Sequence, residues 1–215
     1  MERNIQGLII NLKNNNMTSY FVDTKEDALE LVEKLIPEGA SVTNGGSVTL
    51  GEVGVTELLR SGKYEYLDRS RCVTREDTQE LYRKSFGVDF FLTSSNAVTM
   101  NGELYNVDGN ANRVANIAYG AKKVIVIVGV NKIVDDLGEA VLRVKQIAAP
   151  LNAKRLELQT YCAQCGECVS LKKTDPAMSD GCHSPQRICC QYLVSGFQRD
   201  PDRVSVIIVN EELGY

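Results

Sequence analysis

The sequence has no long apolar run, no excess of positive charge and no internal repeat. No apolar stretch approaches the roughly 18 residues that a membrane-spanning helix requires, so we expect no membrane partner. A net charge of −4 gives no general attraction to nucleic acid or to anionic membranes, which excludes both as main partners. The polar segment at residues 1–6 is unlike a secretion signal, and we therefore expect a cytoplasmic protein.

The length and composition fit one large globular domain. A chain of 215 residues, with 43% hydrophobic and 24% charged residues, can bury a core of its own. It needs neither a disulfide nor a metal for stability alone, so any metal is expected to be a local feature. Because no stretch resembles a linker, we expect a single domain over residues 1–215, with residues 161–190 as an insertion within it.

Helical and strand patterns alternate along the chain. Apolar residues recur at helical spacing in residues 2–16, 28–35, 58–59, 81–86, 114–118 and 137–148. Strand-type composition occurs at residues 18–22, 40–43, 64–67, 88–93, 97–100, 103–107, 122–129 and 204–209. The helix at 137–148 is expected to end before Pro150, because a proline restricts the residue ahead of it.

Two strand patterns indicate the fold class. Asn101-Gly102, between residues 97–100 and 103–107, is the strongest short signal for a β-hairpin. Residues 122–129 form a continuous β-branched run, typical of a central strand that is covered on both faces. Alternating strands and helices with one hairpin predict an α/β fold, in which a mainly parallel mixed sheet has helices on both faces. The cysteine-rich insertion is expected outside the sheet, before the last strand.

The glycine-rich segment 44–51, which follows a predicted strand, is the first candidate site. Its adjacent glycines permit positive φ and close approach of a ligand to the backbone. Backbone amides and hydroxyls there can hold a carboxylate or a phosphate ahead of the next helix. The alternative is a tight strand-to-helix turn without a ligand. The candidate residues are Asn44, Gly45, Gly46, Ser47 and Thr49.

The segment 108–113 is the second candidate site, and it combines an acid, carboxamides and a guanidinium at a predicted helix start. Arg113 can grip a carboxylate or phosphate with two parallel hydrogen bonds. In the alternative, Asn110 or Asn112 caps the helix and Arg113 is solvated. The candidate residues are Asp108, Gly109, Asn110, Asn112 and Arg113.

Asn131 and Lys132 directly follow the predicted central strand. Ligands of α/β proteins gather at the carboxyl ends of the strands, so we expect these residues on the same rim as the two segments above. Lys132 can neutralise an anionic ligand, or it can be an ordinary surface lysine near a helix end. Together the three polar loops predict a site for a small anionic metabolite.

Six of the seven cysteines lie between Cys162 and Cys190. Because the cytosol is reducing, this favours metal binding or redox chemistry over disulfides, with free thiols as the alternative. The overlapping C-x-x-C steps at Cys162, Cys165 and Cys168 favour an iron–sulfur cluster, although zinc needs a similar geometry. The fourth ligand must come from Cys182, Cys189 or Cys190, and the predicted metal ligands are Cys162, Cys165, Cys168, Cys182 and Cys189.

Three further residues bear on this site. His183 follows Cys182 directly, and it is either a zinc ligand of a mixed site or an ordinary loop histidine. Adjacent Cys189 and Cys190 cannot easily both bind one ion, so one of them is expected to be a spectator. Cys72 lies far from the cluster in sequence and is expected to be a free thiol.

Four segments together resemble the lactate-utilisation (LUD) domain family: T-N-G-G-S-V-T-L-G-E-V-G at 43–54, F-L-T-S-S-N-A-V-T-M-N-G-E-L at 91–104, N-V-D-G-N-A-N-R-V-A at 106–115 and V-G-V-N-K-I-V at 128–134. Asn96, within the second segment, joins the candidate ligand-binding residues. S-P-Q-R-I-C at 184–189 resembles the cysteine-bearing end of a clostridial-type subgroup. In that subgroup the resemblance implies cysteines corresponding to Cys162, Cys168, Cys182 and Cys189.

The resemblance implies a NagB/RpiA/CoA-transferase-like fold and an association with lactate oxidation through iron–sulfur partner proteins. The chain departs from the pattern at Ala111, in the longer gap between Cys168 and Cys182, and in the extra Cys165 and Cys190. No catalytic base is evident, so the sequence predicts a binding site and leaves catalysis open.

Three functions compete. The leading hypothesis is a redox-associated protein that binds a small 2-hydroxy or 2-keto acid. The first alternative is a non-redox sugar-phosphate or acyl-CoA enzyme or sensor, in which zinc only braces a loop. The second alternative is a noncatalytic subunit whose cysteine-rich segment docks on a partner.

Overall fold

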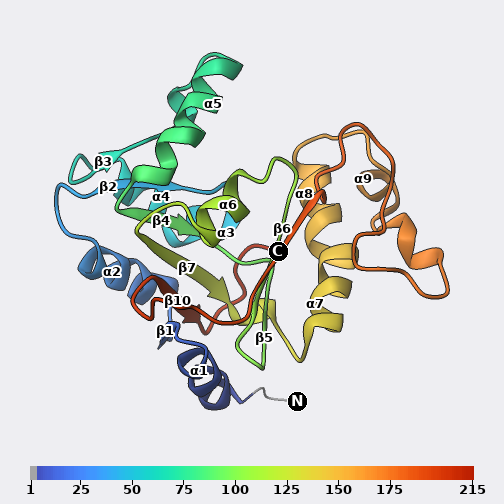
Figure 1. The fold of residues 1–215 in the computed structure, drawn as a ribbon, viewed down its shortest axis with the longest axis horizontal. Coiled ribbons are helices and arrows are strands. Elements are labelled where there is room, and N and C mark those ends of the chain that lie inside the picture. The colour runs from blue at the N-terminus through green and yellow to red at the C-terminus, as the bar shows by residue number, and fades with distance from the viewer. Residues whose placement is uncertain (1–3) are drawn as a thin grey trace.

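A parallel sheet of six strands lies at the centre of the computed structural model, which describes residues 4–215 (Figure 1). The strand order is β1-β10-β7-β4-β2-β3, and every neighbouring pair is parallel. The strands are β1 (Thr18–Val22), β10 (Val204–Val209), β7 (Lys123–Gly129), β4 (Phe90–Thr93), β2 (Ser41–Asn44) and β3 (Glu65–Tyr66). The predicted α/β fold with a mainly parallel sheet is therefore confirmed.

Strand β7 is an inner strand of this sheet, as the β-branched run predicted. It pairs with β10 on one side and with β4 on the other. Val124, Val126 and Val128 point into one core cluster, whereas Ile125 and Ile127 point into another. Because successive side chains of a strand face opposite sides, a strand with a helix layer on each side must be apolar throughout.

Three helices cover the face to which Ile125 and Ile127 point. They are α2 (Lys25–Leu35), α3 (Val48–Val53) and α4 (Val55–Leu59). Thr24 begins α2 with a capping box, in which its hydroxyl accepts from the Asp27 amide and the Asp27 carboxylate accepts from the Thr24 amide. Gly54, with φ of 86°, separates α3 from α4. The expected loop at 44–51 is thus shorter than predicted, because α3 already begins at Val48.

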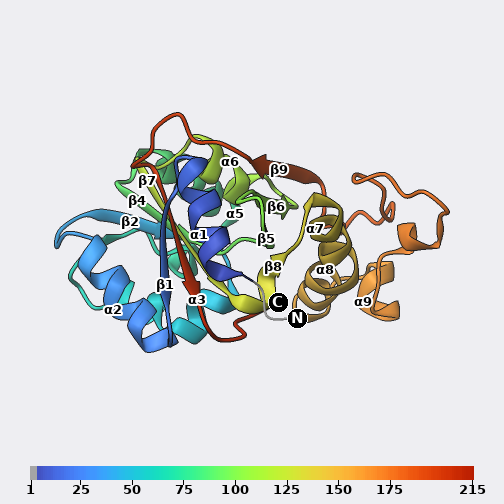
Figure 2. The same ribbon diagram turned by 90° about the horizontal axis from the view of Figure 1, so that it is seen from below.

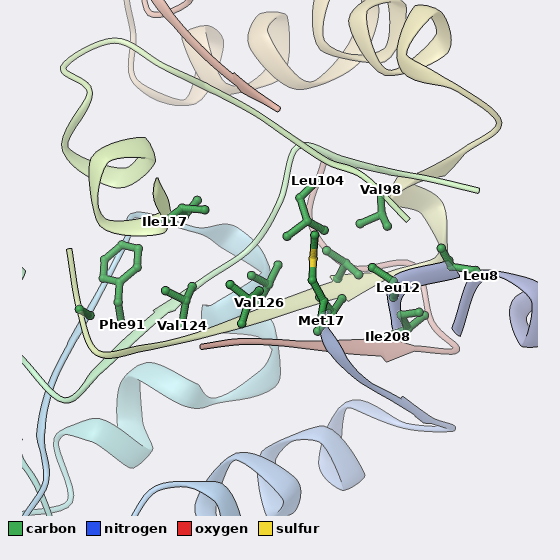
Figure 3. Close-up of a cluster of buried hydrophobic side chains, with 14 of the residues drawn as sticks. Leu8, Leu12, Met17, Phe91, Val98, Leu104, Ile117, Val124, Val126 and Ile208 are labelled. Atoms are coloured by element: carbon green, nitrogen blue, oxygen red, sulfur yellow. The ribbon is translucent and has the colours of Figure 1, made fainter. Parts of the chain in front are cut away.

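The opposite face of the parallel sheet is covered by α1 (Ile5–Asn14), α6 (Asn112–Ala118) and a second sheet. Figure 3 shows Leu8 and Leu12 of α1 and Ile117 of α6 packed over the strands. Helices therefore lie on both faces, as predicted. The first helix was expected at residues 2–16, and its first two residues lie outside the described part of the chain.

The second sheet has four strands in the order β8-β5-β6-β9. These strands are β8 (Ile133–Val134), β5 (Ala97–Thr99), β6 (Leu104–Asp108) and β9 (Gln191–Ser195). Strands β5 and β6 form the predicted hairpin around Gly102, whose φ is 81°. The expectation of one mixed sheet was wrong. Val98 and Leu104 pack on the core of the parallel sheet while Ala97 and Tyr105 pack toward α7, so the hairpin forms a layer of its own.

A long helical run lies beyond the second sheet. It consists of α7 (Leu137–Arg143), a π-helical turn (Val144–Ala148) and α8 (Ala149–Arg155). The prediction that the helix ends before Pro150 was wrong. Proline lacks an amide hydrogen and clashes with the carbonyl four residues earlier. The widened π turn directly ahead of Pro150 accommodates both effects, and Pro150 then lies in the first turn of α8.

The cysteine-rich segment lies outside both sheets, beside α8 and before β10, as predicted (Figures 1 and 2). It contains the short helix α9 (Tyr161–Cys165) and a 3-10 turn at Val169–Lys172. Helix α5 (Arg75–Lys84) also projects from the body and has no buried residue. Within residues 4–215 no helix is both long and apolar enough to cross a bilayer.

Candidate functional site

A cavity of about 250 Å³ opens where the two sheets, α8 and the end of the cysteine-rich segment meet. We call it the polar cavity. Its wall includes residues 46–49, 94–96, 107–110 and 112–113, together with Arg69, Lys132, Asn152, Arg155, Ile188, Cys189 and Tyr215. The loops after β2, β6 and β7 all contribute, so the structure brings together the three segments that the sequence singled out.

Most of the predicted ligand-binding residues line this cavity. They are Gly46, Ser47, Thr49, Asn96, Asp108, Gly109, Asn110, Asn112, Arg113 and Lys132. Asn44, Gly45 and Asn131 do not line it. Asn44 accepts a hydrogen bond from the Tyr66 hydroxyl, and Gly45 packs so closely on the Arg113 side chain that a Cβ there would lie 3.1 Å from Cδ.

Asn131 holds the last part of the chain in place. Its Oδ1 accepts from the Leu213 amide at 3.1 Å, and its Nδ2 donates to the Gly214 carbonyl at 3.1 Å. A Cβ at Gly214 would lie 2.6 Å from Thr49 Oγ1 and 3.4 Å from Lys132 Nζ. The predicted contribution of Asn131 to the site is therefore indirect in this structure: it positions residues 213–214 against the floor of the polar cavity.

Arg113 organises the cavity wall. The side chain is buried, and Nε donates to Asp108 Oδ1 at 2.9 Å. The other donors of the guanidinium bind Ser94 O, Asn106 Oδ1, Asn96 Oδ1 and Val107 O. All five N–H groups are thus used within the protein. Arg113 offers a ligand its positive charge and no free N–H group.

The alternative account of segment 108–113 was wrong. Arg113 is not solvated, and neither Asn110 nor Asn112 caps α6. Instead, Asp108 Oδ2 accepts from the amides of Arg113 and Val114, each at 2.9 Å, at the first turn of the helix. The side chains of Asn110 and Asn112 make no hydrogen bond within residues 4–215, so their carboxamides are available at the cavity.

Lys132 lies at the floor of the polar cavity and is 3% exposed. Its Nζ lies 2.7 Å from Thr49 Oγ1 and 3.0 Å from Ser94 Oγ, and it forms no ion pair with a carboxylate of residues 4–215. Burial, and to a smaller extent the positive charges of Arg143 and Arg113, lower the pKa of Lys132 to about 7. The alternative of a surface lysine was therefore wrong.

A second buried cation stands behind the wall. Arg143 is buried, and it donates to the carbonyl groups of Asn131 at 3.1 Å and Asn96 at 2.7 Å. Burial lowers its pKa to about 10. No carboxylate among the described residues pairs with Arg143, so its charge adds to the positive potential at the cavity floor.

Sequence reasoning missed the cations at the cavity mouth. Arg69 lies beside Gly46, where a Cβ would be 3.3 Å from Nη2. Arg155 donates to the Tyr215 hydroxyl at 2.7 Å and to Asn152 Oδ1 at 2.8 Å. Both arginines are exposed, and neither forms an ion pair within residues 4–215. Spacing of three places Asn152 and Arg155 on one helix face, but the predicted helix stopped before them.

A second, smaller cavity of about 20 Å³ lies next to the polar cavity. Cys162, Cys168, Cys182 and Cys189 line it, among the apolar parts of Tyr105, Val141, Val144, Ala149 and Met178. We call it the cysteine cavity. The structure therefore brings together all of the predicted metal ligands except Cys165. Cys165 is exposed, as are Cys190 and His183, and none of these three lines the cavity.

The thiols of the cysteine cavity have few polar partners. Cys162 Sγ lies 3.4 Å from Thr160 Oγ1, and Cys168 Sγ lies 3.3 Å from Ser170 Oγ. Burial raises the pKa of the Cys189 thiol. Residues 4–215 contain no group of three or more His, Cys, Asp or Glu side chains arranged to hold a single metal ion.

The two cavities share a wall. Val144, Ala149 and Cys189 line both of them. The Cys190 amide donates to the Asp108 carbonyl at 2.9 Å, and a Cβ at Gly109 would lie 3.3 Å from the Ile188 Cα. The end of the cysteine-rich segment is therefore packed directly on the loop that carries Asp108 and Arg113.

Comparison with known proteins gives a family match over nearly the whole chain. The family described as the LUD domain matches residues 5–209. No curated protein matches the chain. Among solved structures, a DUF162 family protein from Deinococcus radiodurans is 14% identical, with a TM-score of 0.50 over 95% of each chain. This likeness concerns the fold alone.

Two further structures are similar over part of the chain. A D-ribose-5-phosphate isomerase in complex with phospho-erythronic acid is 20% identical, with a TM-score of 0.34 over 53% of this chain and 54% of that chain. The eIF2B delta protein from Chaetomium thermophilum is 18% identical, with a TM-score of 0.36 over 64% of this chain and 55% of that chain.

Proposed function

The chain belongs to the LUD domain family, and from that premise we propose that it binds a small anionic 2-hydroxy or 2-keto acid in the polar cavity and an iron–sulfur cluster in the cysteine cavity. The family is associated with lactate utilisation, so lactate and pyruvate are the first candidates for the acid. The cluster would make the protein a component of a redox pathway with partner proteins.

The observation that carries the first half is the unbalanced charge of the polar cavity. Arg69, Arg113, Lys132 and Arg155 line it, whereas among residues 4–215 the only acidic side chain in its lining is that of Asp108, which is already paired with Arg113. Low-dielectric walls strengthen the field of such a cluster, so an anion gains more there than at an open surface. A bound carboxylate would supply the missing negative charge.

The cavity also offers hydrogen-bonding groups suited to a hydroxyl or a carbonyl. The carboxamides of Asn110 and Asn112 are free to donate and accept. A volume of about 250 Å³ lies below the range usual for drug-sized ligands, roughly 300–1,000 Å³. Size and chemistry together favour a metabolite of a few carbons over a large cofactor.

The donor set of the cysteine cavity fits an iron–sulfur cluster. Such clusters are bound by four cysteine thiolates, and Cys162, Cys168, Cys182 and Cys189 all face this one cavity. When bound, the cluster would supply one-electron transfer.

A thermal shift panel tests the bound acid. We expect lactate and pyruvate to raise the melting temperature in a concentration-dependent way, because a ligand that binds only the native state stabilises it. Phosphorylated sugars are the matched comparison. Stabilisation by phosphosugars alone would favour the sugar-phosphate alternative and reject the proposed ligand class.

Metal analysis of anaerobically prepared protein tests the cluster. We expect a brown protein that contains iron and sulfide and absorbs light at about 400 nm, as thiolate-bound clusters do. A colourless protein with stoichiometric zinc would reject electron transfer, and it would leave the zinc only a bracing role in the cysteine-rich segment.

A further inference from the structure

We propose that Lys132 Nζ is a nucleophile that attacks the carbonyl carbon of a 2-keto acid in the polar cavity and forms a reversible imine. The inference rests on the proposed function, because it assumes that the polar cavity takes such an acid. It goes further by giving the site a covalent chemistry and by separating 2-keto acids from 2-hydroxy acids as ligands.

The hydrogen bonds around Lys132 leave one position on its nitrogen open. Thr49 Oγ1 donates its hydrogen to the Leu213 carbonyl at 3.2 Å, and Ser94 Oγ donates to the Ser95 carbonyl at 3.4 Å. A hydroxyl has one hydrogen, and with those hydrogens directed at the carbonyl groups both oxygens accept from Nζ. A neutral amine has two N–H groups and one lone pair, and these two hydroxyls use both N–H groups. The lone pair remains.

The charged form of Lys132 is less well accommodated. A third N–H would find no carboxylate partner among residues 4–215. The charged groups that act on Nζ are Arg143 and Arg113, which repel a proton, and Glu52, whose attraction is the smallest of the influences. Burial disfavours the ammonium most strongly and lowers the pKa to about 7. A large share of the amine is therefore neutral near pH 7, the state that reacts with carbonyl groups.

Different residues of the polar cavity would bind the two functional groups of a 2-keto acid. Arg69 and Arg155 are exposed at the polar cavity and can neutralise a carboxylate, whereas Lys132 is buried at its floor. A 2-keto acid whose carboxylate binds the arginines can direct its adjacent carbonyl inward. Thr49 and Ser94 hold the Nζ in place, so little rotational freedom is lost when the bond forms.

The reaction balances without an oxidant or a reductant. The Nζ lone pair forms a bond to the carbonyl carbon, and a proton passes from nitrogen to oxygen to give a carbinolamine. The carbon–oxygen bond then breaks, water leaves with a second proton from the nitrogen, and a carbon–nitrogen double bond remains. Hydrolysis by the same steps in reverse regenerates the amine and the keto acid.

Borohydride trapping tests the inference on the wild-type protein. Sodium borohydride reduces an imine to a stable secondary amine, so incubation with pyruvate should add one reduced pyruvate unit, which peptide mapping should place at Lys132. Lactate has no carbonyl and should give no adduct. Near pH 7 the adduct at Lys132 should exceed that at an exposed lysine by about tenfold or more, since ordinary lysines are charged there.

Two variants serve as controls. Lys132→Met keeps a side chain of similar length and should lose the adduct. Lys123→Met changes an exposed lysine at the other end of β7 and should keep it. A thermal melt without ligand shows whether Lys132→Met is folded, and the wild-type mapping does not depend on that variant.

The outcomes separate the inference from the proposed function. If pyruvate stabilises the wild-type protein but borohydride yields no adduct at Lys132, the imine is rejected and the proposed binding stands. If neither pyruvate nor lactate stabilises the protein and no adduct forms, both fail. An adduct on Lys132 that requires pyruvate supports both.

Discussion

The polar cavity and the cysteine cavity share a wall but are held in different ways. In the polar cavity the buried cations Arg113 and Lys132 direct their hydrogen bonds at protein groups, so the fold itself fixes their positions. In the cysteine cavity the thiols have few polar partners and lie in a mainly apolar lining that also includes Lys145 and Asp180. The difference indicates that protein hydrogen bonds fix the side chains of the first cavity, whereas the thiols of the second would be held by the proposed cluster.

The largest expected effect concerns the cysteine cavity. Cys168→Ser should remove most of the bound iron, by about tenfold or more, because an iron–sulfur cluster requires its thiolate ligands. Cys165→Ser is the matched control, since Cys165 is exposed and does not line the cavity. Both variants are compared with the wild-type protein by their iron content and their absorbance at about 400 nm. Equal loss of iron in the two variants would contradict the assignment of the four buried or half-buried cysteines as ligands.

The next effect concerns the polar cavity. Arg113→Met should lower the free energy of unfolding by about 3–5 kcal/mol, because it leaves Asp108 and several carbonyl groups buried without their donor. Urea denaturation measures the change. Arg83→Met, on the exposed helix α5, should stay within about 0.5 kcal/mol of wild type. A loss below about 1 kcal/mol for Arg113→Met would show that the cavity wall does not depend on this network.

A pH effect follows from Lys132. Its pKa is lowered to about 7 in the folded protein from the ordinary lysine value of 10.5, so between these values the unfolded chain binds more protons. The free energy of unfolding should therefore rise with pH across this window, and the destabilisation by the buried amine is fully present below pH 7. Lys132→Met should lack this rise, which amounts to a few kcal/mol. Parallel pH profiles for the two proteins, measured by urea denaturation, would argue against a buried neutral amine.

A smaller effect is expected from the wall that the polar cavity and the cysteine cavity share. Gly109→Ala places a Cβ 3.3 Å from the Ile188 Cα, where backbone must move against backbone. We expect a loss of about 1–2 kcal/mol in unfolding free energy, with weaker binding of both lactate and iron. Gly51→Ala, where a Cβ meets nothing within 4 Å, should be neutral or stabilising. If Gly109→Ala changes only one of the two bindings, the cavities are less closely coupled than their contacts indicate.

The smallest effect concerns the cavity mouth. Arg155→Gln should weaken lactate binding about threefold to fivefold, since an exposed cation contributes up to about 1 kcal/mol. Lys154→Gln is the control, because Lys154 is exposed and does not line the cavity. Titration calorimetry at low and high salt measures both, and added salt should reduce the difference between them. Equal weakening by the two variants would mean that only the overall charge matters.

The elements that were predicted correctly have strong local signals. The hairpin depends on Asn101-Gly102, and the central strand depends on an unbroken β-branched run at 122–129. Strand β9 was missed because four of the five residues of Gln191–Ser195 are exposed or half-exposed and the strand lies at a sheet edge, where alternation is weak. Pro150 misled the prediction because the compensating π turn has no recognised sequence signature.

The sequence identified most residues of the candidate site, but it did not predict the roles of these residues. Local polarity indicated segment 108–113, but the acceptors that occupy Arg113, such as Ser94 O and Asn96 Oδ1, come from another loop. Arg155 and Asn152 were missed because only tertiary packing brings α8 to the cavity. Cysteine spacing suggested Cys165 as a ligand, yet helix α9 buries Cys162 and leaves Cys165 exposed.

The π turn at Val144–Ala148 determines in which direction the side chains of the following helix α8 point. A π turn holds one residue more than an α turn, and each residue advances an α-helix by about 100°. Deleting one residue from this turn would rotate Asn152 and Arg155 by about that angle around the helix axis, away from the cavity they line. The orientation of Arg155 toward the polar cavity therefore depends on the one extra residue in the π turn, about two helical turns earlier in the chain.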